Sequence, residues 1–247
     1  MKTQQLRQFT EGDHRTWQKL FDRQTPLRNV QMHPIFARGL EKLGIAERGV
    51  PDLDDVNRRL KKITGFEGVP VEGLEQGQSF FVGLQERKFP LGNFIRDERD
   101  LNYTPAPDIF HDLYGHIPFF ADKDYAEFCR KAGDAAASLE GDADKQRQFE
   151  RFFWFTIEFG LVETPKGRRI FGAGIASSFS ECAYALSTEP DVVPYTVEAV
   201  RSQEYRIDMM QKRLFVMQSP EELYNSLDQV IEKIKTTPVR EVSPVQM

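Results

Sequence analysis

The chain has 247 residues, enough for one large domain with a sizeable core, and its 40% apolar content excludes an intrinsically disordered protein. A net charge of −5 and a pI of about 5.5, without a basic cluster, argue against a nucleic-acid partner. No apolar run approaches a membrane span, and the first residues, MKTQQLRQF, lack the apolar part of a secretory signal. The two cysteines, Cys129 and Cys182, have no CxxC neighbour, which predicts a reducing, cytoplasmic location.

The first half of the chain carries repeated helix start and stop signals, namely capping aspartates, prolines at first helical positions and glycines after last turns. These signals predict helices that start at Asp13, that run from Pro34 to near Gly44, and that cover residues 52–63 with Gly65 as the stop. A loop is expected over residues 68–77. Residues 80–95 predict a short helix followed by a strand.

The second half continues in the same way. Helices are predicted over residues 108–116, from Asp122 through the alanine-rich stretch near 135–137, over 146–161, over 178–186 and from Pro220 to about Lys235. Short strands are expected at residues 168–171 and within 205–217. These elements predict a single, mostly α-helical domain with minor β structure over residues 1–247, whose Pro- and Val-rich tail, 236–247, frays.

Two of the four histidines, His111 and His116, stand five residues apart in the stretch PDIFHDLYGHIP. On an ideal α-helix five residues turn about 500°, so their side chains would point roughly 140° apart. They converge only if the helix ends or bulges between them, which the wide conformational range of Gly115 would allow. Pro118 then prevents a regular helix from continuing. The pair is either a metal-binding bend or two hydrogen-bonded structural histidines.

Glu158 is the only charged residue between Arg151 and Glu163, within the sequence RFFWFTIEFGLV. An aromatic helix of this kind is expected to be buried nearly all round. A carboxylate buried there without a partner would be costly or would take up a proton. It therefore requires a metal ion, a water-filled cleft or an arginine, and an ion pair with Arg96 is the alternative to a metal site.

Two neutral imidazoles and one carboxylate make the facial triad of non-haem Fe(II) oxygenases, which leaves positions for water, dioxygen or a cosubstrate. The candidate metal ligands are therefore His111, His116 and Glu158. Asp112, beside His111, is a candidate to orient a ligand or contact a cosubstrate, or else a solvated surface residue. A zinc hydrolase that uses the same three ligands stays open as an alternative.

Three motifs, PDIFHDLYGHIPFFADKDYAEF, FFWFTIEFGL and FGAGIASSFSE, resemble the catalytic domain of the pterin-dependent aromatic amino acid hydroxylases, and most of all the small bacterial phenylalanine 4-hydroxylases. The resemblance extends from TGFEGVPVEGL to YRIDMMQKRLFV and covers about residues 15–230. It implies a mostly helical catalytic domain and Fe(II) held by His111, His116 and Glu158. It also implies a tetrahydropterin cosubstrate, such as tetrahydrobiopterin, and O₂ that is split between the pterin and an aromatic amino acid.

The resemblance implies roles for residues around the metal as well. The substrate carboxylate would be bound by Arg96, because a guanidinium fork offers two parallel charged hydrogen bonds. Further substrate contacts are implied for Thr104, Pro107, Trp154, Phe159, Gly174 and Ser177. Pterin contacts are implied for Val71, Gly73, Leu74, Phe80, Asp112 and Phe153. Judged from the residues alone, the aromatic members of the substrate set would be assigned to the core, the glycine to a turn and the serine to a helix cap.

Phenylalanine is the expected substrate, because Ile207 falls where an acidic residue would indicate the tyrosine-hydroxylating branch of the family. Hydroxylation of tryptophan, or of phenylalanine at the meta position, stays open, as does a catalytically silent binding protein. The chain departs from the family's animal members at Glu75 and Gly77 in the pterin loop, at Pro90, which replaces a histidine, and at Ala106, which replaces an acid. It also shows neither a regulatory domain nor a long oligomerisation helix, so a monomer is expected.

Overall fold

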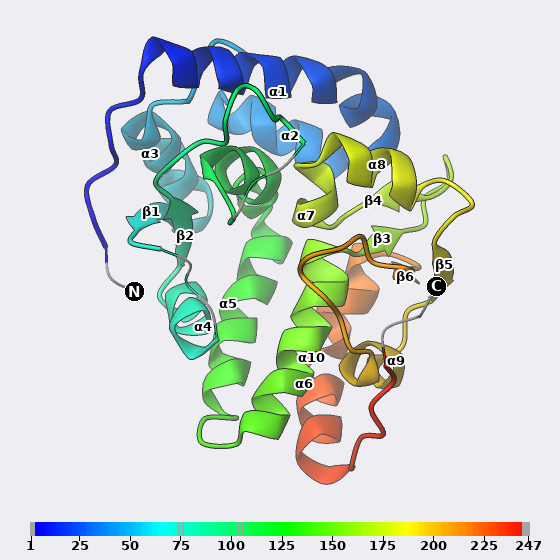
Figure 1. Ribbon diagram of the computed structural model, residues 1–247. Helices are drawn as coiled ribbons and strands as arrows, with labels where there is room; N and C mark the ends of the chain where they lie inside the picture. Colours follow the sequence, from blue (N-terminus) through cyan, green and yellow to red (C-terminus); the bar gives the residue numbers. More distant parts are fainter. Residues whose placement is uncertain (1–2, 74, 76, 103, 105, 244–247) are drawn as a thin grey trace.

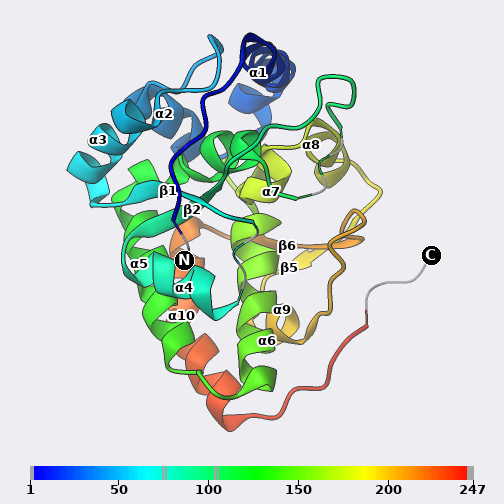
Figure 2. The ribbon, with the colours of Figure 1, turned by 60° about the vertical axis from the view of Figure 1, so that its left-hand side comes forward.

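Long helices form the frame of the molecule. The computed structural model describes residues 3–73, 75, 77–102, 104 and 106–243. Within them the α-helices are α1 (Glu11–Gln31), α2 (Pro34–Leu43), α3 (Leu53–Thr64), α4 (Gln78–Gln85), α5 (Lys123–Ala137), α6 (Ala143–Phe153), α7 (Ala173–Ala176), α8 (Phe179–Ala185), α9 (Val197–Ser202) and α10 (Pro220–Thr236). Helices α5, α6 and α10 run side by side, and α1, α2 and α3 lie across one end of this group (Figures 1 and 2).

Two small sheets flank the helices on opposite sides in Figure 1. Their strands are β1 (Glu67–Val71), β2 (Lys88–Gly92), β3 (Leu161–Val162), β4 (Arg169–Ile170), β5 (Asp191–Pro194) and β6 (Arg213–Met217). Strands β1 and β2 pair in parallel, and the second sheet has the order β4-β3-β6-β5 with only the β3–β4 pair antiparallel. The predicted fold class, mostly α with minor β, is confirmed.

The helix boundaries that rest on local capping signals are confirmed. Asp52 and Asp122 cap α3 and α5 through their side chains, and Ser219 caps α10. Helix α1 differs, because it starts before Asp13. Thr10 is its cap: the Thr10 hydroxyl accepts from the Asp13 N–H, and the Asp13 carboxylate accepts from the Thr10 N–H, a reciprocal capping box.

Contacts between distant segments account for the elements that the sequence did not predict. The loop expected over 68–77 is wrong for residues 68–71, which form β1 because β2 and the side-chain amide of Asn57 satisfy their backbone. The helix expected over 146–161 begins earlier, in α6, and Leu161 belongs to β3 instead. Strands β3 and β5 pair with β6, which lies far along the chain, so neither has a strong local signal.

The segment of residues 109–121 lies at the centre of an aromatic core. Phe110 and Tyr114 are fully buried and stack at a centroid distance of 4.6 Å. Phe119 and Phe120, also fully buried, pack on Tyr125 of α5. The histidines of this segment are therefore held by some of the most tightly packed residues of the chain.

The C-terminal tail differs from the expected frayed segment. Val242 donates its N–H to the Ser202 carbonyl at 2.9 Å and accepts from the Glu204 N–H at 2.8 Å. Residues 244–247 lie outside the described part. No helix among the described residues is long and apolar enough to cross a membrane.

The close approach of α4 and α5 generates a stability prediction. A Cβ added at Gly133 would lie 2.5 Å from the Gln85 nitrogen and 2.6 Å from the Phe81 oxygen, both backbone atoms. Gly133→Ala is therefore expected to lower the free energy of unfolding by about 1–3 kcal/mol. This loss is expected although alanine has a higher helix propensity than glycine. Urea denaturation provides the measurement. The control is Gly12→Ala in α1, where the nearest atoms stand at 3.6 Å and no loss is expected; equal effects of the two changes would contradict the packing account.

Candidate metal centre and active site

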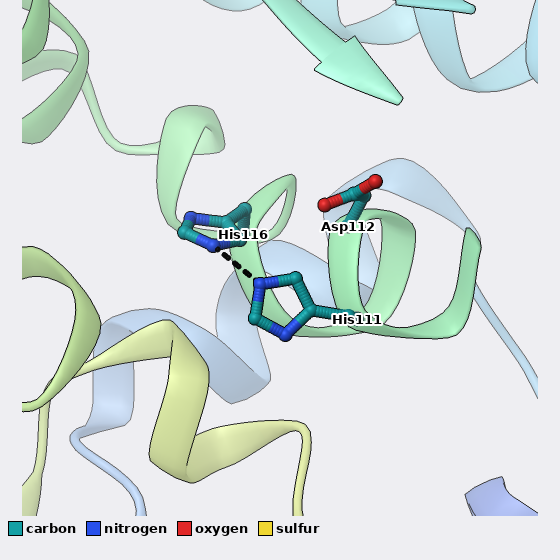
Figure 3. Close-up of side chains that lie close together, drawn as sticks. All are labelled: His111, Asp112 and His116. Atoms are coloured by element: carbon teal, nitrogen blue, oxygen red, sulfur yellow. Dashed lines mark hydrogen bonds between the residues drawn. The ribbon is translucent and has the colours of Figure 1, made fainter. Parts of the chain in front are cut away.

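A π-helical turn brings the two histidines of the core segment together. The predicted helix over residues 108–116 is present, and His111–His116 form a π-helix, in which the Ile117 N–H bonds to the Asp112 carbonyl five residues back. Residues five apart lie on one side of such a turn. The Nε2 atoms of His111 and His116 are 3.1 Å apart (Figure 3).

Gly115 supports this turn by its size. Its φ angle is not positive, so the expectation that it adopts a conformation closed to other residues is wrong. A Cβ at this position would lie 2.9 Å from the Ala173 oxygen and 3.0 Å from the Ser177 Cβ, so the hydrogen side chain allows α7 to approach the π-helix.

Glu158 reaches the same point from a second π-helix, Trp154–Glu158, which continues α6. Its Oε1 lies 3.2 Å from His116 Nε2, and its Oε2 lies 3.9 Å from His111 Nε2. The alternative of an ion pair between Glu158 and Arg96 is wrong, because Arg96 pairs with Asp108. A Cβ at Gly174 would stand 3.2 Å from Glu158 Oε2, so this glycine leaves room for the carboxylate.

The electrostatics of the three groups favour a cation between them. Burial, together with the neighbouring His116, lowers the pKa of His111 to about 4. Burial acts to raise the pKa of Glu158, but His116 and His111 outweigh it and the pKa is lowered. Burial likewise acts to lower the pKa of His116, and Glu158 outweighs it, so this pKa is raised. The shifts favour a neutral His111 and an ionised Glu158, as metal binding requires, whereas His116 holds its proton more strongly and a metal ion would displace that proton.

Hydrogen bonding fixes which nitrogen of His111 faces the centre. Ser177 Oγ donates to the Gly174 carbonyl at 3.2 Å, so it accepts from His111 Nδ1 at 2.9 Å. The lone pair of His111 Nε2 then points toward His116 and Glu158. The ring of His116 lies against Phe89 at a centroid distance of 4.6 Å.

The spacing of the three donors fits a single metal ion. Ligand atoms bound about 2.0–2.2 Å from one ion stand about 3 Å apart in adjacent positions, and the observed separations are 3.1, 3.2 and 3.9 Å. Without a metal ion, one proton on His116 Nε2 would have to serve both His111 Nε2 and Glu158 Oε1, and the remaining lone pairs would face one another. His111, His116 and Glu158 therefore form a plausible site for a small divalent ion with nitrogen and oxygen ligands.

Asp112 lies beside this centre. One ligand atom each of Asp112, His111 and His116 lie within 4.8 Å of one another. However, Asp112 Oδ2 accepts the Gly92 N–H at 2.6 Å, and Figure 3 shows its carboxylate next to the imidazoles rather than between them. Burial raises the pKa of Asp112 to about 7. Its position suits contact with a neighbouring molecule better than direct ligation.

Arg96 is joined to the histidine helix by a buried carboxylate. Its Nε and Nη2 donate to Asp108 at 2.8 and 2.9 Å, and Asp108 also accepts the His111 N–H at 2.9 Å. Arg96 Nη1 donates to the Leu101 carbonyl at 3.3 Å. These bonds leave the paired end of the guanidinium, one N–H on each of Nη1 and Nη2, to bind a further carboxylate.

Three aromatic rings form a stack next to Glu158. Trp154 lies against Phe159 at 4.8 Å and against Tyr205 at 4.3 Å, the latter with an interplanar angle of only 13°. The indole nitrogen of Trp154 is buried and has no hydrogen-bond partner in the described part of the chain. Tyr205 was not identified from the sequence, where its only signal is its place in the YRIDMM motif.

The remaining predicted substrate residues lie on the segment before the histidine helix, apart from Ile207. The Thr104 hydroxyl donates to the Ala106 carbonyl. The Pro107 carbonyl packs against Gly92: a Cβ added at Gly92 would stand 2.5 Å from the Pro107 carbonyl oxygen. Ile207 is 73% exposed, within a run of exposed residues, 206–210, so the structure does not place it against the ring stack.

The predicted pterin residues lie between β1, α4 and α6. Phe80 contacts Phe153 edge-on at 5.4 Å and also packs against Phe81 and Phe89. Val71 ends β1 and its carbonyl accepts from the Gln4 side chain. Gly73 is exposed, and Leu74 lies outside the described residues.

Comparison with known proteins identifies the family of this chain. The family model of the biopterin-dependent aromatic amino acid hydroxylases matches residues 4–242. The chain is 38% identical to a phenylalanine-4-hydroxylase of Ralstonia nicotianae, over 90% of this chain and 71% of that protein. It is 37% identical to one of Pseudomonas aeruginosa, over 87% of this chain and 82% of that protein.

Solved structures of such enzymes share the fold. A cobalt-bound phenylalanine hydroxylase of Chromobacterium violaceum superposes with a TM-score of 0.92 at 32% identity, over 100% of this chain and 90% of that one. The same enzyme with iron(III) and 7,8-dihydrobiopterin superposes with a TM-score of 0.90 at 32% identity, over 99% and 90%. The chain belongs to the biopterin-dependent aromatic amino acid hydroxylase family.

Proposed function

We propose that this protein is a phenylalanine 4-monooxygenase, which uses Fe(II), a tetrahydropterin and O₂ to hydroxylate the ring of L-phenylalanine to L-tyrosine. One observation carries the proposal: His111, His116 and Glu158 converge next to the Arg96–Asp108 pair and the Trp154 ring stack. A redox metal site, a carboxylate-binding guanidinium and an aromatic wall are the three features that hydroxylation of an aromatic amino acid requires. The named relatives are phenylalanine hydroxylases, which supports this substrate.

In this proposal His111, His116 and Glu158 hold the iron from one side. Bound iron and reduced pterin supply the activation of dioxygen. Ser177 keeps His111 in the tautomer whose Nε2 faces the ion, and it would also contact the substrate. Phe89 and the aromatic core on the other side of His116 keep the site in a low-polarity environment.

The substrate would be oriented by residues at both of its ends. Arg96 would bind the carboxylate with its free N–H pair, and Thr104 would assist from the adjoining segment. The substrate ring would lie on the wall that contains Trp154 and Phe159, beside Pro107 and Gly174. Gly174 faces the Glu158 carboxylate. This placement holds the ring edge toward the metal and lowers the entropic cost of the reaction.

The pterin would lie on the opposite wall. Phe80 and Phe153 offer an apolar, aromatic surface to a flat heterocycle. Backbone groups near Val71, Gly73 and Leu74 would bind its polar edge, and Asp112, whose pKa is close to 7, would accept or donate a hydrogen bond there.

We further propose that the chain is one catalytic domain that acts as a monomer in the cytoplasm. Exposed large hydrophobic side chains are few in the described residues; half of them, Ile207, Met209 and Met210, lie on one short segment, and Val30, Phe179 and Val242 lie elsewhere along the chain. Both cysteines, Cys129 and Cys182, are buried free thiols, as suits a reducing compartment.

The ligand assignment predicts different effects for the two carboxylates near the histidines. Glu158→Gln is expected to weaken Fe(II) binding by more than about 100-fold, beyond the 10–100-fold typical of losing a group that only orients a ligand. Asp112→Asn is expected to change it by less than about tenfold, because Asp112 is held by Gly92. Equilibrium dialysis of Fe(II) measures both; the reverse order would assign the third ligand to Asp112.

The activity itself is tested by incubating the protein with Fe(II), tetrahydrobiopterin, air and phenylalanine, tyrosine or tryptophan separately. Pterin-dependent formation of p-tyrosine from phenylalanine is the expected result. Mass and retention time distinguish p-tyrosine from m-tyrosine and from hydroxytryptophan. Zinc retained after iron-free purification, with no uptake of oxygen on any amino acid, would instead support a hydrolase.

A further inference from the structure

Tyr205 covers one side of the proposed ring-binding wall. It stacks on Trp154 at 4.3 Å and meets Phe155 edge-on at 6.2 Å. The residues that follow it, 206–210, are exposed; Arg206 forms an ion pair with Asp208, and the side-chain amide of Gln211 donates to the Arg206 and Met209 carbonyls at 2.6 and 3.1 Å. These contacts join residues 206–211 to one another, whereas the residues before Tyr205 are joined to α6 and to the C-terminal tail.

The C-terminal tail binds the segment directly before Tyr205. Val242 exchanges two backbone hydrogen bonds with this segment, from its N–H to the Ser202 carbonyl and from the Glu204 N–H to its own carbonyl. The side-chain amide of Gln203 adds bonds to the Val242 and Ser243 carbonyls, each of 3.2 Å. The tail thus forms a short parallel bridge with residues 202–204.

A buried arginine ties the same two segments to α6. Arg151 stands one helical turn before Trp154, and its side chain is only 3% exposed. It pairs with Glu241 of the tail at 2.9 Å and with Glu204 at 3.4 Å. Because a buried guanidinium needs counter-charge, Arg151 favours the arrangement in which both carboxylates stay docked. The pair Arg151–Glu204 and the stack Trp154–Tyr205 are adjacent contacts of one interface.

The tail is also fixed where it leaves α10. Arg201 of α9, which is fully buried, donates to the Thr237 carbonyl at 3.0 Å and to the Lys233 carbonyl at 3.4 Å. From there the tail runs past α9 in Figure 1. Residues 237–243 are thus anchored at both ends, by Arg201 at one and by Arg151 with the backbone of 202–204 at the other.

We propose that residues 237–243 act as a strap that positions Tyr205 on Trp154, with Glu241 as the positioning residue, and so set the affinity of the site for its aromatic substrate. The inference rests on the proposed function in that Trp154 forms the ring-binding wall. Glu241 itself does not touch that wall; it acts through Arg151 and Glu204.

The two tryptophans of the chain provide a direct readout. The protein is labelled with 5-fluorotryptophan, and its two ¹⁹F resonances are assigned with a Trp154→Phe variant. Glu241→Gln removes the charge of the strap, and Val242→Pro separately removes the N–H that bonds to Ser202. In each variant the Trp154 resonance is expected to shift or broaden, while that of Trp17, a buried residue of α1 whose indole N–H donates to the Ala46 carbonyl, stays unchanged.

Kinetics provide the second readout. The KM for phenylalanine is expected to rise about fivefold in Glu241→Gln with kcat unchanged, because the chemistry is untouched and only binding is weakened. Glu232→Gln, which removes one negative charge at an exposed position of α10, is the matched control and should alter neither resonance nor the KM. An unmoved Trp154 resonance in both strap variants, or a KM that does not change when the resonance moves, would overturn the proposal. The NMR result needs no turnover, so it decides the strap even if the wild-type protein fails to hydroxylate phenylalanine.

Discussion

The buried carboxylate of Asp108 sets the relation between the two halves of the site. One oxygen accepts the His111 N–H and a guanidinium N–H of Arg96, and the other accepts the backbone and Nε N–H groups of the same arginine. Asp108 is fully buried, so each of these bonds is formed away from competing water. The helix that carries the metal-binding histidines and the arginine that would bind the substrate therefore move as one unit.

The geometry of the metal centre depends on two π-helical turns. His111 and His116 face one point because residues five apart lie nearly in line along a π-helix, and Glu158 ends a second π-helix. Such turns are stable here because their surroundings are packed: Gly115 admits α7, and Gly174 admits the Glu158 carboxylate. The π-turns thus combine a local backbone irregularity with close approach of a separate helix, as is common at functional sites.

Local signals explain how much was predictable from the sequence. Capping residues such as Asp52, Asp122 and Ser219 act within a few positions, so the helix starts that they mark are correct. The isolated charge of Glu158 and the spacing of the histidines identified the candidate ligands for the same reason. Contacts between distant segments leave little local trace: Tyr205 on Trp154 and the pairing that forms β1 depend on neighbours brought together only by the fold. Ile207 was chosen by its position in a motif, which does not report whether the fold buries a side chain, and the structure exposes it.

The most direct test of this account compares Asp108→Ala with Asp97→Ala, a change at an exposed aspartate that pairs only with the nearby Arg99. Asp108 touches neither the metal nor the substrate in this account, yet its loss leaves the buried Arg96 without a carboxylate partner and removes the side-chain acceptor of the His111 N–H. Loss of one member of a buried ion pair is strongly destabilising. In Asp108→Ala the Kd for Fe(II) and the KM for phenylalanine are therefore both predicted to rise at least about tenfold. In Asp97→Ala both constants are predicted to stay unchanged. A folded Asp108→Ala protein in which either constant keeps its wild-type value would contradict the claim that one carboxylate fixes both halves of the site.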